Sequence, residues 1–155
     1  EMDYLEALAE LFPSCDAFYF NVSGKLFEAE EIRNNKIKGS DRFIRYAVNV
    51  RFFTIQGSED MLVDTLGMGS LYLPDLQYHF HNLNPNSVVN HAYNVASYLL
   101  SSGSEIKSGE TIDGVTDGLM DRSVRWKCQY EDALIQPNRS VLDINTGIHA
   151  SGNRE

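Results

Sequence analysis

The clearest hydrophobic pattern along the chain predicts an amphipathic helix over residues 85–102. Apolar side chains recur there at spacings of three and four residues, in two adjacent rows that form one broad face. The rows are Val88, Ala92, Val95 and Leu99, and Val89, Tyr93, Ala96 and Leu100. Asn84 suits the N-cap, Pro85 suits the first turn and Gly103 suits the C-terminal end. A face of this width can lie flat on a sheet.

Alternation of apolar and polar residues predicts strands in much of the remaining chain. The expected strands cover residues 16–22, 43–53, 61–66, 76–81, 124–130 and 141–144, with helices at 2–12 and 25–35. A tight hairpin is expected over residues 106–112, with Ser108 and Gly109 at its turn. These elements predict one α+β domain over residues 1–148, in which helices pack on one face of a mostly antiparallel sheet. Residues 149–155 show no apolar period and are expected to form a frayed tail.

Composition places the 155-residue chain among single globular domains, with 43% hydrophobic and 23% charged residues. Its 13 Lys and Arg against 22 Asp and Glu give a net charge of −9, which disfavours nucleic acid and anionic membranes as partners. No apolar run approaches the ~20 residues of a membrane-spanning helix. Cys15 and Cys128 lie in apolar surroundings without metal-binding spacing, so two reduced thiols and a cytoplasmic location are expected.

Two stretches, residues 65–77 and 106–112, carry a family resemblance. The first has a Thr-x-Gly-Met turn and then a strand opened by Pro and an acid, and the second has Lys-x-Gly-x-Thr-Ile after the long helix. In order and spacing they resemble the bacterial family named domain of unknown function 4261, best over residues 43–115. The matching positions are Thr65, Gly67, Met68, Pro74, Asp75, Gly109, Thr111 and Ile112.

The resemblance implies turn and core roles for these positions, and it brings no catalytic residue and no cofactor to the chain. Residues 2–22 look like the middle of longer members, so the resemblance also implies the C-terminal part of a longer protein.

A basic segment is the least ordinary feature of this acidic chain. Residues 33–51 hold six of the 13 basic residues, and Asp41 is the only acidic residue among them. The six are Arg33, Lys36, Lys38, Arg42, Arg45 and Arg51. On the expected strand 43–53, Arg45 and Arg51 would stand about 20 Å apart. That span suits an extended acidic partner, such as another protein, the missing N-terminal region or a second copy. The chain's own acidic surface and a merely solubilising loop are the alternatives.

Two short motifs are candidates for ligand chemistry. His79 and His81 share one strand face and could hold Zn²⁺ or Cu²⁺ if His91 or Asp75 supplied a third ligand. A polar outer face of an edge strand is the simpler interpretation, and neither a metal nor a cofactor is expected. Residues 67–70 superficially resemble a phosphate loop, but no Lys follows them, so they indicate a glycine turn with Met68 in the core.

Asp113, Asp117 and Asp121 recur every four residues but fail the calcium-loop pattern, because Val115 occupies its third position. They indicate a solvated acidic loop.

These observations favour a non-enzymatic protein-interaction or immunity-type module, since acidic surfaces suit basic partners. The alternatives are an enzyme with a small site near residues 65–81 and a structural or oligomerisation domain of a longer chain.

Overall fold

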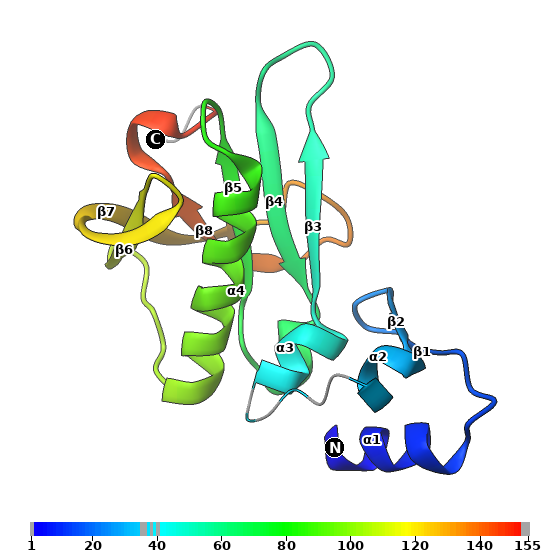
Figure 1. Cartoon of the computed structure of the whole chain (residues 1–155). Coiled ribbons are helices and arrows are strands. Elements are labelled where there is room, and N and C mark those ends of the chain that lie inside the picture. Colours follow the sequence, from blue (N-terminus) through cyan, green and yellow to red (C-terminus); the bar gives the residue numbers. More distant parts are fainter. Residues whose placement is uncertain (1, 35–36, 38, 40, 153–155) are drawn as a thin grey trace.

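The computed structural model describes residues 2–34, 37, 39 and 41–152. Figure 1 shows its elements in space. In chain order they are α1 (Met2–Leu11), β1 (Ala17–Phe20), β2 (Lys25–Glu28), α2 (Ala29–Asn34), α3 (Asp41–Ala47), β3 (Asn49–Thr54), β4 (Met61–Leu66), η1 (Met68–Leu71), β5 (Asp75–Phe80), α4 (Pro85–Ser102), β6 (Thr111–Thr116), β7 (Leu119–Asp132), β8 (Ser140–Asn145) and η2 (Gly147–His149). No helix in the described residues is long and apolar enough to cross a membrane.

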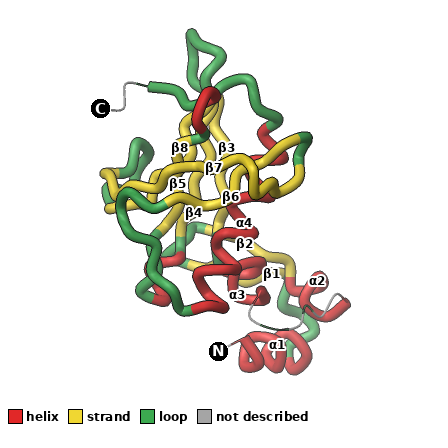
Figure 2. The backbone as a smooth tube through the Cα atoms, turned by 90° about the vertical axis from the view of Figure 1, so that its left-hand side faces the viewer, coloured by secondary structure: helices red, strands yellow, loops and turns green. Residues whose placement is uncertain are grey.

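A six-stranded sheet in the order β3-β4-β5-β8-β7-β6 forms the centre of the molecule. All neighbouring strands run antiparallel except β5 and β8, which pair in parallel. The sheet is strongly twisted, so that the β6–β7 ribbon crosses the direction of β4 and β5 (Figure 2). The predicted α+β fold with a largely antiparallel sheet is confirmed.

Helix α4 packs on one face of this sheet and matches the predicted helix in both bounds (Figure 1). The Asn84 side chain accepts a hydrogen bond from the Asn86 amide, and Gly103 ends the helix with φ 62°. Its predicted inner row is buried and joins the strand residues Leu76, Tyr78 and Leu142 in one hydrophobic core. Tertiary packing and local capping therefore favour the same helix boundaries.

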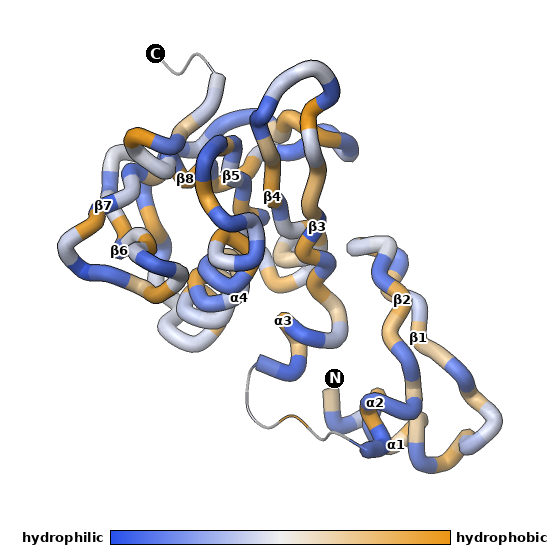
Figure 3. The backbone as a smooth tube through the Cα atoms, turned by 45° about the horizontal axis from the view of Figure 1, so that its top comes forward, coloured by the Kyte–Doolittle hydropathy of each residue, from blue (hydrophilic) through white to orange (hydrophobic). Residues whose placement is uncertain are grey.

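A small N-terminal unit of α1, α2 and the β1–β2 hairpin lies beside the sheet (Figures 1 and 3). Its core contains Ala9 and Ile32, and it is completed by Tyr46 of α3. The Asn49 side-chain amide also donates a 3.2 Å hydrogen bond to the carbonyl of Ser23. The unit is therefore joined to the sheet through α3 and the start of β3.

The strand expected over residues 43–53 is wrong in its first half, where α3 stands in its place. Ile44, Ala47 and Val48 lie three and four residues apart and are all buried, so a helix buries Ile44 and Val48, which the alternation selected, together with Ala47, which it placed on the other face. Asp41 in the first turn favours the helix, because a carboxylate there interacts well with the helix dipole. The helix expected over 25–35 likewise begins as strand β2 and becomes α2 only at Ala29.

The tight turn expected at Ser108 and Gly109 is present, with the Glu110 amide donating to the Lys107 carbonyl at 3.1 Å, but the residues on either side of it do not pair as a hairpin. Gly109 turns the chain with φ 94°, and the turned segment then joins β7. The Gly109 amide donates to the Cys128 carbonyl and the Cys128 amide to the Glu110 carbonyl, each at 2.8 Å. The true hairpin joins β6 to β7 through Asp117 and Gly118, both with positive φ.

Residues 149–152 are not frayed, contrary to expectation. Ala150 bridges to Phe80, and the Ser151 amide donates a 2.9 Å hydrogen bond to the His79 carbonyl. The segment therefore packs against the end of β5. Backbone hydrogen bonds hold it there, although its sequence has no apolar pattern. Residues 153–155 of the expected tail lie outside the described residues.

Gly67→Ala is expected to destabilise the protein by more than about 1 kcal/mol. Gly67 has φ 121°, and an added Cβ would lie 2.9 Å from Cβ of Ser23 and 3.2 Å from the carbonyl oxygen of Ala47. Gly69→Ala is the matched control, because open space surrounds its Cβ position. Thermal and denaturant unfolding measure both. Equal melting temperatures for the two variants would contradict the expectation.

Candidate functional site

A row of polar side chains crosses the sheet on the face opposite α4. The strand registers pair Arg51 with Asp64, Asp64 with Gln77, Gln77 with Asp143 and Asp143 with Gln129. The row therefore spans five neighbouring strands, from β3 to β7. Asp64, Gln77 and Asp143 are 0%, 1% and 2% exposed. Such deep burial of polar groups requires partners for each of them.

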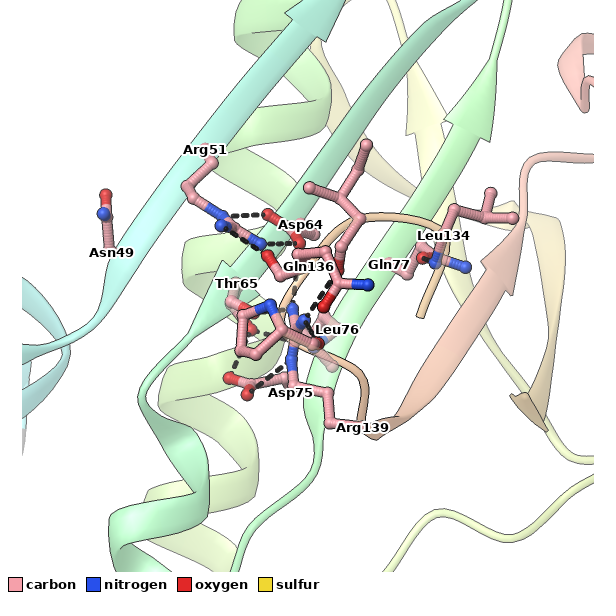
Figure 4. A network of polar contacts seen from close by, with 12 residues as sticks. Asn49, Arg51, Asp64, Thr65, Asp75, Leu76, Gln77, Leu134, Gln136 and Arg139 are labelled. Carbon is pink, nitrogen blue, oxygen red and sulfur yellow. Dashed lines mark hydrogen bonds and ion pairs between the residues drawn. The ribbon is translucent and has the colours of Figure 1, made fainter. Parts of the chain in front are cut away.

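Asp64 lies at the centre of the strongest part of this row (Figure 4). Arg51 binds its carboxylate in a bidentate manner, with Nε–Oδ1 at 2.8 Å and Nη2–Oδ2 at 2.5 Å. Arg139, from the loop between β7 and β8, adds a contact of 2.8 Å from Nη2 to Oδ2. Two guanidinium groups thus compensate one fully buried carboxylate.

Asp75 extends the network to the loop after β4. Its Oδ2 accepts from Nε of Arg139 at 3.1 Å, and its Oδ1 accepts from the Thr65 hydroxyl at 3.2 Å and the Met68 amide at 3.1 Å. Burial raises the pKa of the Asp75 carboxyl, while the Met68 amide and Arg139 act in the opposite direction. The first family motif therefore fixes the β4–β5 loop, with Met68 fully buried. Pro74 immediately precedes this carboxylate at the start of β5.

The loop formed by residues 133–139 lies over the row and closes it. The Leu134 amide donates to Oε1 of Gln77 at 2.8 Å, and Nη1 of Arg51 donates to the carbonyl of Gln136 at 3.0 Å (Figure 4). Gln77 in turn donates to Asp143 at 3.0 Å. The polar row thus attaches this loop to the sheet. The buried polar atoms of Arg51 and Gln77 form the hydrogen bonds that hold the loop.

Arg33 of the basic segment binds backbone within the N-terminal unit. Its Nε donates to the carbonyl of Ala9 at 2.8 Å, and its Nη2 donates to the carbonyl of Cys15 at 2.7 Å. These carbonyls lie at the end of α1 and in the turn that follows. Arg33 therefore connects α2 with the C-terminal end of α1.

Arg42 binds two carboxylates of α1. Its Nη1 lies 2.7 Å from Oδ1 of Asp3 and 3.1 Å from Oε2 of Glu6. Hydrogen bonding and charge from the guanidinium lower the pKa of Asp3. Arg51 likewise pairs with Asp64. Two arginines of the basic segment therefore bind acidic residues of the same chain, as one of the alternative interpretations of this segment expects.

The remaining members of the basic segment do not share a strand. Arg45 lies on the exposed side of α3, whereas Arg51 lies on β3, so the expected 20 Å spacing along one strand is wrong. Lys36 and Lys38 lie outside the described residues. The structure therefore does not bring together as one surface the four basic side chains of this segment that it describes.

The histidines that the sequence singled out lie apart from their expected partners. His81 contacts the Ser151 hydroxyl at 3.0 Å through Nδ1. His79 is at the same end of β5, whereas Asp75 opens that strand about 13 Å away. Within the described part of the chain, no group of three or more His, Cys, Asp or Glu side chains is arranged to hold a metal ion.

His91 lies in the core between α4, β5 and β6. Its Nδ1 is 2.9 Å from the Tyr78 hydroxyl, and its Nε2 is 2.7 Å from the Asp113 carbonyl. Burial lowers the pKa of His91. A neutral ring that donates from Nε2 and accepts at Nδ1 satisfies both contacts, so its role is structural.

The three regularly spaced acids belong to the β6–β7 hairpin rather than to a loop. Asp113 is on β6, Asp117 is at the turn and Asp121 is on β7. Asp113 forms an ion pair with Arg125, and Asp121 accepts from the Ser123 hydroxyl at 2.7 Å. The second family motif ends here, with Ile112 packed on the core and the Thr111 hydroxyl beside Arg125.

A groove of about 790 Å³ lies between the outer side of α4 and β6. Its apolar side chains include Tyr98 of α4, Ile112 of β6 and Met120 of β7. Tyr98 is 53% exposed and Met120 is 46% exposed, although both are large apolar or aromatic residues. The sequence predicted the inner rows of α4 but not this groove, because its walls come from α4, β6 and β7, which are separate elements of the chain.

Carboxylates border one side of the groove. Glu105 and Glu110 both line it and are exposed. Within the described residues, neither has a basic side chain at ion-pair distance. Arg125 also lines the groove but is paired with Asp113. The groove therefore combines an apolar floor with a negative rim.

A second hollow, of about 1010 Å³, continues from the first and shares Asn94 and Met120 with it. Its far wall contains Lys25 and Phe27 of β2. The Lys25 amine donates to the carbonyls of Arg45 and, at 2.8 Å, Val48, at the C-terminal end of α3. Burial, aided by the charge of Arg45, lowers the pKa of Lys25 to about 8.

Comparison with known families gives one match, which covers just over half of the 155 residues. The family described as domain of unknown function (DUF4261) matches residues 64–145, from Asp64 of the polar row to the end of β8. Neither the curated proteins nor the solved structures contain a match to the chain. The second half of β4, strands β5 to β8, helix α4 and the groove beside it thus fall within the matched segment, and the chain belongs to the DUF4261 family.

Proposed function

We propose that the chain is a protein-binding module and that its binding surface is the groove between α4 and β6. The observation that carries this proposal is the exposure of Tyr98 and Met120 in a groove bordered by carboxylates. Concave apolar surfaces with a few polar groups are typical binding sites. Large apolar side chains left exposed together commonly mark an interaction surface.

The position of the groove within the family match supports this choice. All of its lining residues lie between residues 94 and 125, inside the matched segment 64–145. The basic segment at 33–51 lies before that segment, and its guanidinium groups on Arg33, Arg42 and Arg51 already bind within the chain. A function common to the family is therefore better placed at the groove.

The chemistry of the groove favours a basic partner. Glu105 and Glu110 would meet Lys or Arg, while Tyr98, Ile112 and Met120 would contact an apolar side chain. The net charge of −9 would also attract a cationic protein during encounter. The partner we propose is a segment with an apolar side chain flanked by basic residues. An immunity-type protein that blocks a basic toxin would work in this manner.

We place the module in a bacterial cytoplasm. Cys15 and Cys128 are both free thiols, and Cys128 is buried. Burial raises the pKa of the Cys128 thiol to about 11, which keeps it protonated and unreactive near neutral pH. Unpaired cysteines are normal in a reducing compartment.

A labelled heptapeptide that alternates Lys with Leu is expected to bind the groove, as measured by fluorescence anisotropy. Its Glu–Leu and Lys–Ser counterparts are expected to bind at least about tenfold more weakly, because each lacks one half of the recognition. In ¹⁵N-edited NMR spectra, the bound peptide should shift the amides of Asn94, Tyr98, Thr111 and Met120.

Paired variants separate groove binding from general charge attraction. Tyr98→Ser should weaken binding about tenfold, whereas Tyr72→Ser, at a fully exposed tyrosine elsewhere, should leave it unchanged. The double variant Glu105→Gln/Glu110→Gln should weaken binding more than Glu28→Gln/Glu59→Gln does. Binding that maps to another surface, or that both tyrosine variants reduce alike, contradicts the proposal.

A further inference from the structure

Strand β3 is an open edge of the six-stranded sheet. Among the described residues, no strand of the sheet pairs with β3 on the side away from β4, although the loop between β7 and β8 passes behind β3 and emerges beyond it in Figure 1. Its register against β4 is regular from Asn49 to Thr54, without a bulge, and its sequence contains neither Pro nor Lys. Bulges, prolines and lysines are the usual means by which proteins protect a strand edge from pairing.

The backbone of β3 directs three residues toward this open side. The Ile55 amide donates to the Asp60 carbonyl at 3.0 Å, so Ile55 turns its backbone groups toward β4. In an antiparallel pair this orientation alternates, and Val50, Phe52 and Thr54 therefore turn theirs outward. Val48, two residues before Val50, also turns its carbonyl outward, where the Lys25 amine donates to it at 2.8 Å. The open part of the edge therefore begins after Val48.

The opposite edge of the sheet is protected. On β6, the Asp113 carbonyl accepts from His91, and the Thr111 carbonyl accepts from Arg125 at 2.8 Å. Both carbonyls therefore have side-chain partners. No side-chain hydrogen bond to the backbone of Val50, Phe52 or Thr54 occurs among the described residues. The outward backbone groups of β3 are thus available to pair with another strand, whereas these two carbonyls of β6 are not.

We propose that β3 pairs with β3 of a second copy of this chain, antiparallel and centred on Phe52. This register places Phe52 beside its own symmetry mate, Val50 opposite Thr54, and Arg51 opposite Phe53. Aromatic and β-branched residues are favourable cross-strand neighbours, and no like charges face each other. Phe52 is 44% exposed and would be covered by the pairing.

The charges at the two ends of the edge favour this antiparallel arrangement. Glu59 and Asp60 lie in the turn after β3, and Lys25 and Arg45 lie near its start. Antiparallel pairing brings the acidic turn of each copy to the basic end of the other. A second copy is therefore complementary in backbone, side chains and charge. This interface does not involve the groove beside α4, and the groove proposal does not depend on it.

Sedimentation analysis of the chain from about 5 µM to about 500 µM should show reversible dimers. Phe52→Lys and Thr54→Pro should each weaken the dimer at least about tenfold, the first by placing a charge at the interface and the second by removing an outward amide. Ile148→Lys, at an 89% exposed position away from β3, is the control and should dimerise normally. A chain that remains monomeric throughout, or a dimer that both β3 variants leave equally tight, overturns the proposal.

Cysteine cross-linking tests the register directly in a Cys15→Ser background. Phe52→Cys should form an intermolecular disulfide, because residue 52 faces its own mate at about 5.5 Å between Cα atoms. Thr54→Cys is the matched control, since its mate would lie about 13 Å farther along the strand and no disulfide should form. Equal cross-linking of both variants overturns the register.

Discussion

Asp64→Ala is expected to lower the free energy of unfolding by about 3–5 kcal/mol, since it removes the shared partner of two largely buried guanidinium groups. Arg51 and Arg139 are 19% and 14% exposed at their side chains, and Asp64 is fully buried. Without the carboxylate, two cations would face each other across the former site. Chemical denaturation at neutral pH, followed by circular dichroism, measures the loss.

Asp3→Ala is the matched control for this variant. It also removes a carboxylate from an arginine, but Asp3 is 87% exposed and water can replace it at Arg42. Its denaturation midpoint is expected to stay close to that of the unaltered chain. A similar midpoint for Asp64→Ala would show that the buried ion pairs contribute no more than a surface contact.

Leu99→Ala is expected to lower the free energy of unfolding by about 2–5 kcal/mol, because it leaves a cavity between α4 and the sheet. Leu99 is 1% exposed and belongs to the main core. Leu11→Ala, at a 73% exposed position of α1, is the control and should change stability by about 0.5 kcal/mol or less. Denaturant titration of both variants compares them, and a loss below about 1 kcal/mol for Leu99→Ala would contradict the assignment of the buried face.

The sequence predicted those elements for which local signals and burial agree. Helix α4 has a cap at each end and one apolar face, and both bounds were found. Strand β4 was also found in full, because turns flank it on both sides. The error at residues 43–47 arose because Ile44 and Tyr46 satisfy a period of two by coincidence. The contact of Tyr46 with Phe27, which packs α3 on the N-terminal unit, involves residues distant in sequence.

The polar row and the groove could not be read from the sequence. Asp64 in the mostly apolar strand β4 was a usable signal, because a buried carboxylate requires a cation. Its partner Arg139, however, is 75 residues away in a turn, and nothing local connects them. The groove depends in the same way on tertiary packing, which makes Tyr98 of α4 and Met120 of β7 line one hollow. Both features belong to tertiary structure rather than to any periodic pattern.

The central place of β8 has a consequence for folding during synthesis. β8 leaves the ribosome after every other strand of the six-stranded sheet, yet it lies between β5 and β7. Until it emerges, the nascent chain carries two incomplete half-sheets, and each has an inner edge without its neighbour. At about 5–20 residues per second, those edges stay open to pairing with other nascent chains until β8 arrives. A transcript that ends before residue 140 would therefore yield an aggregating product rather than a smaller domain.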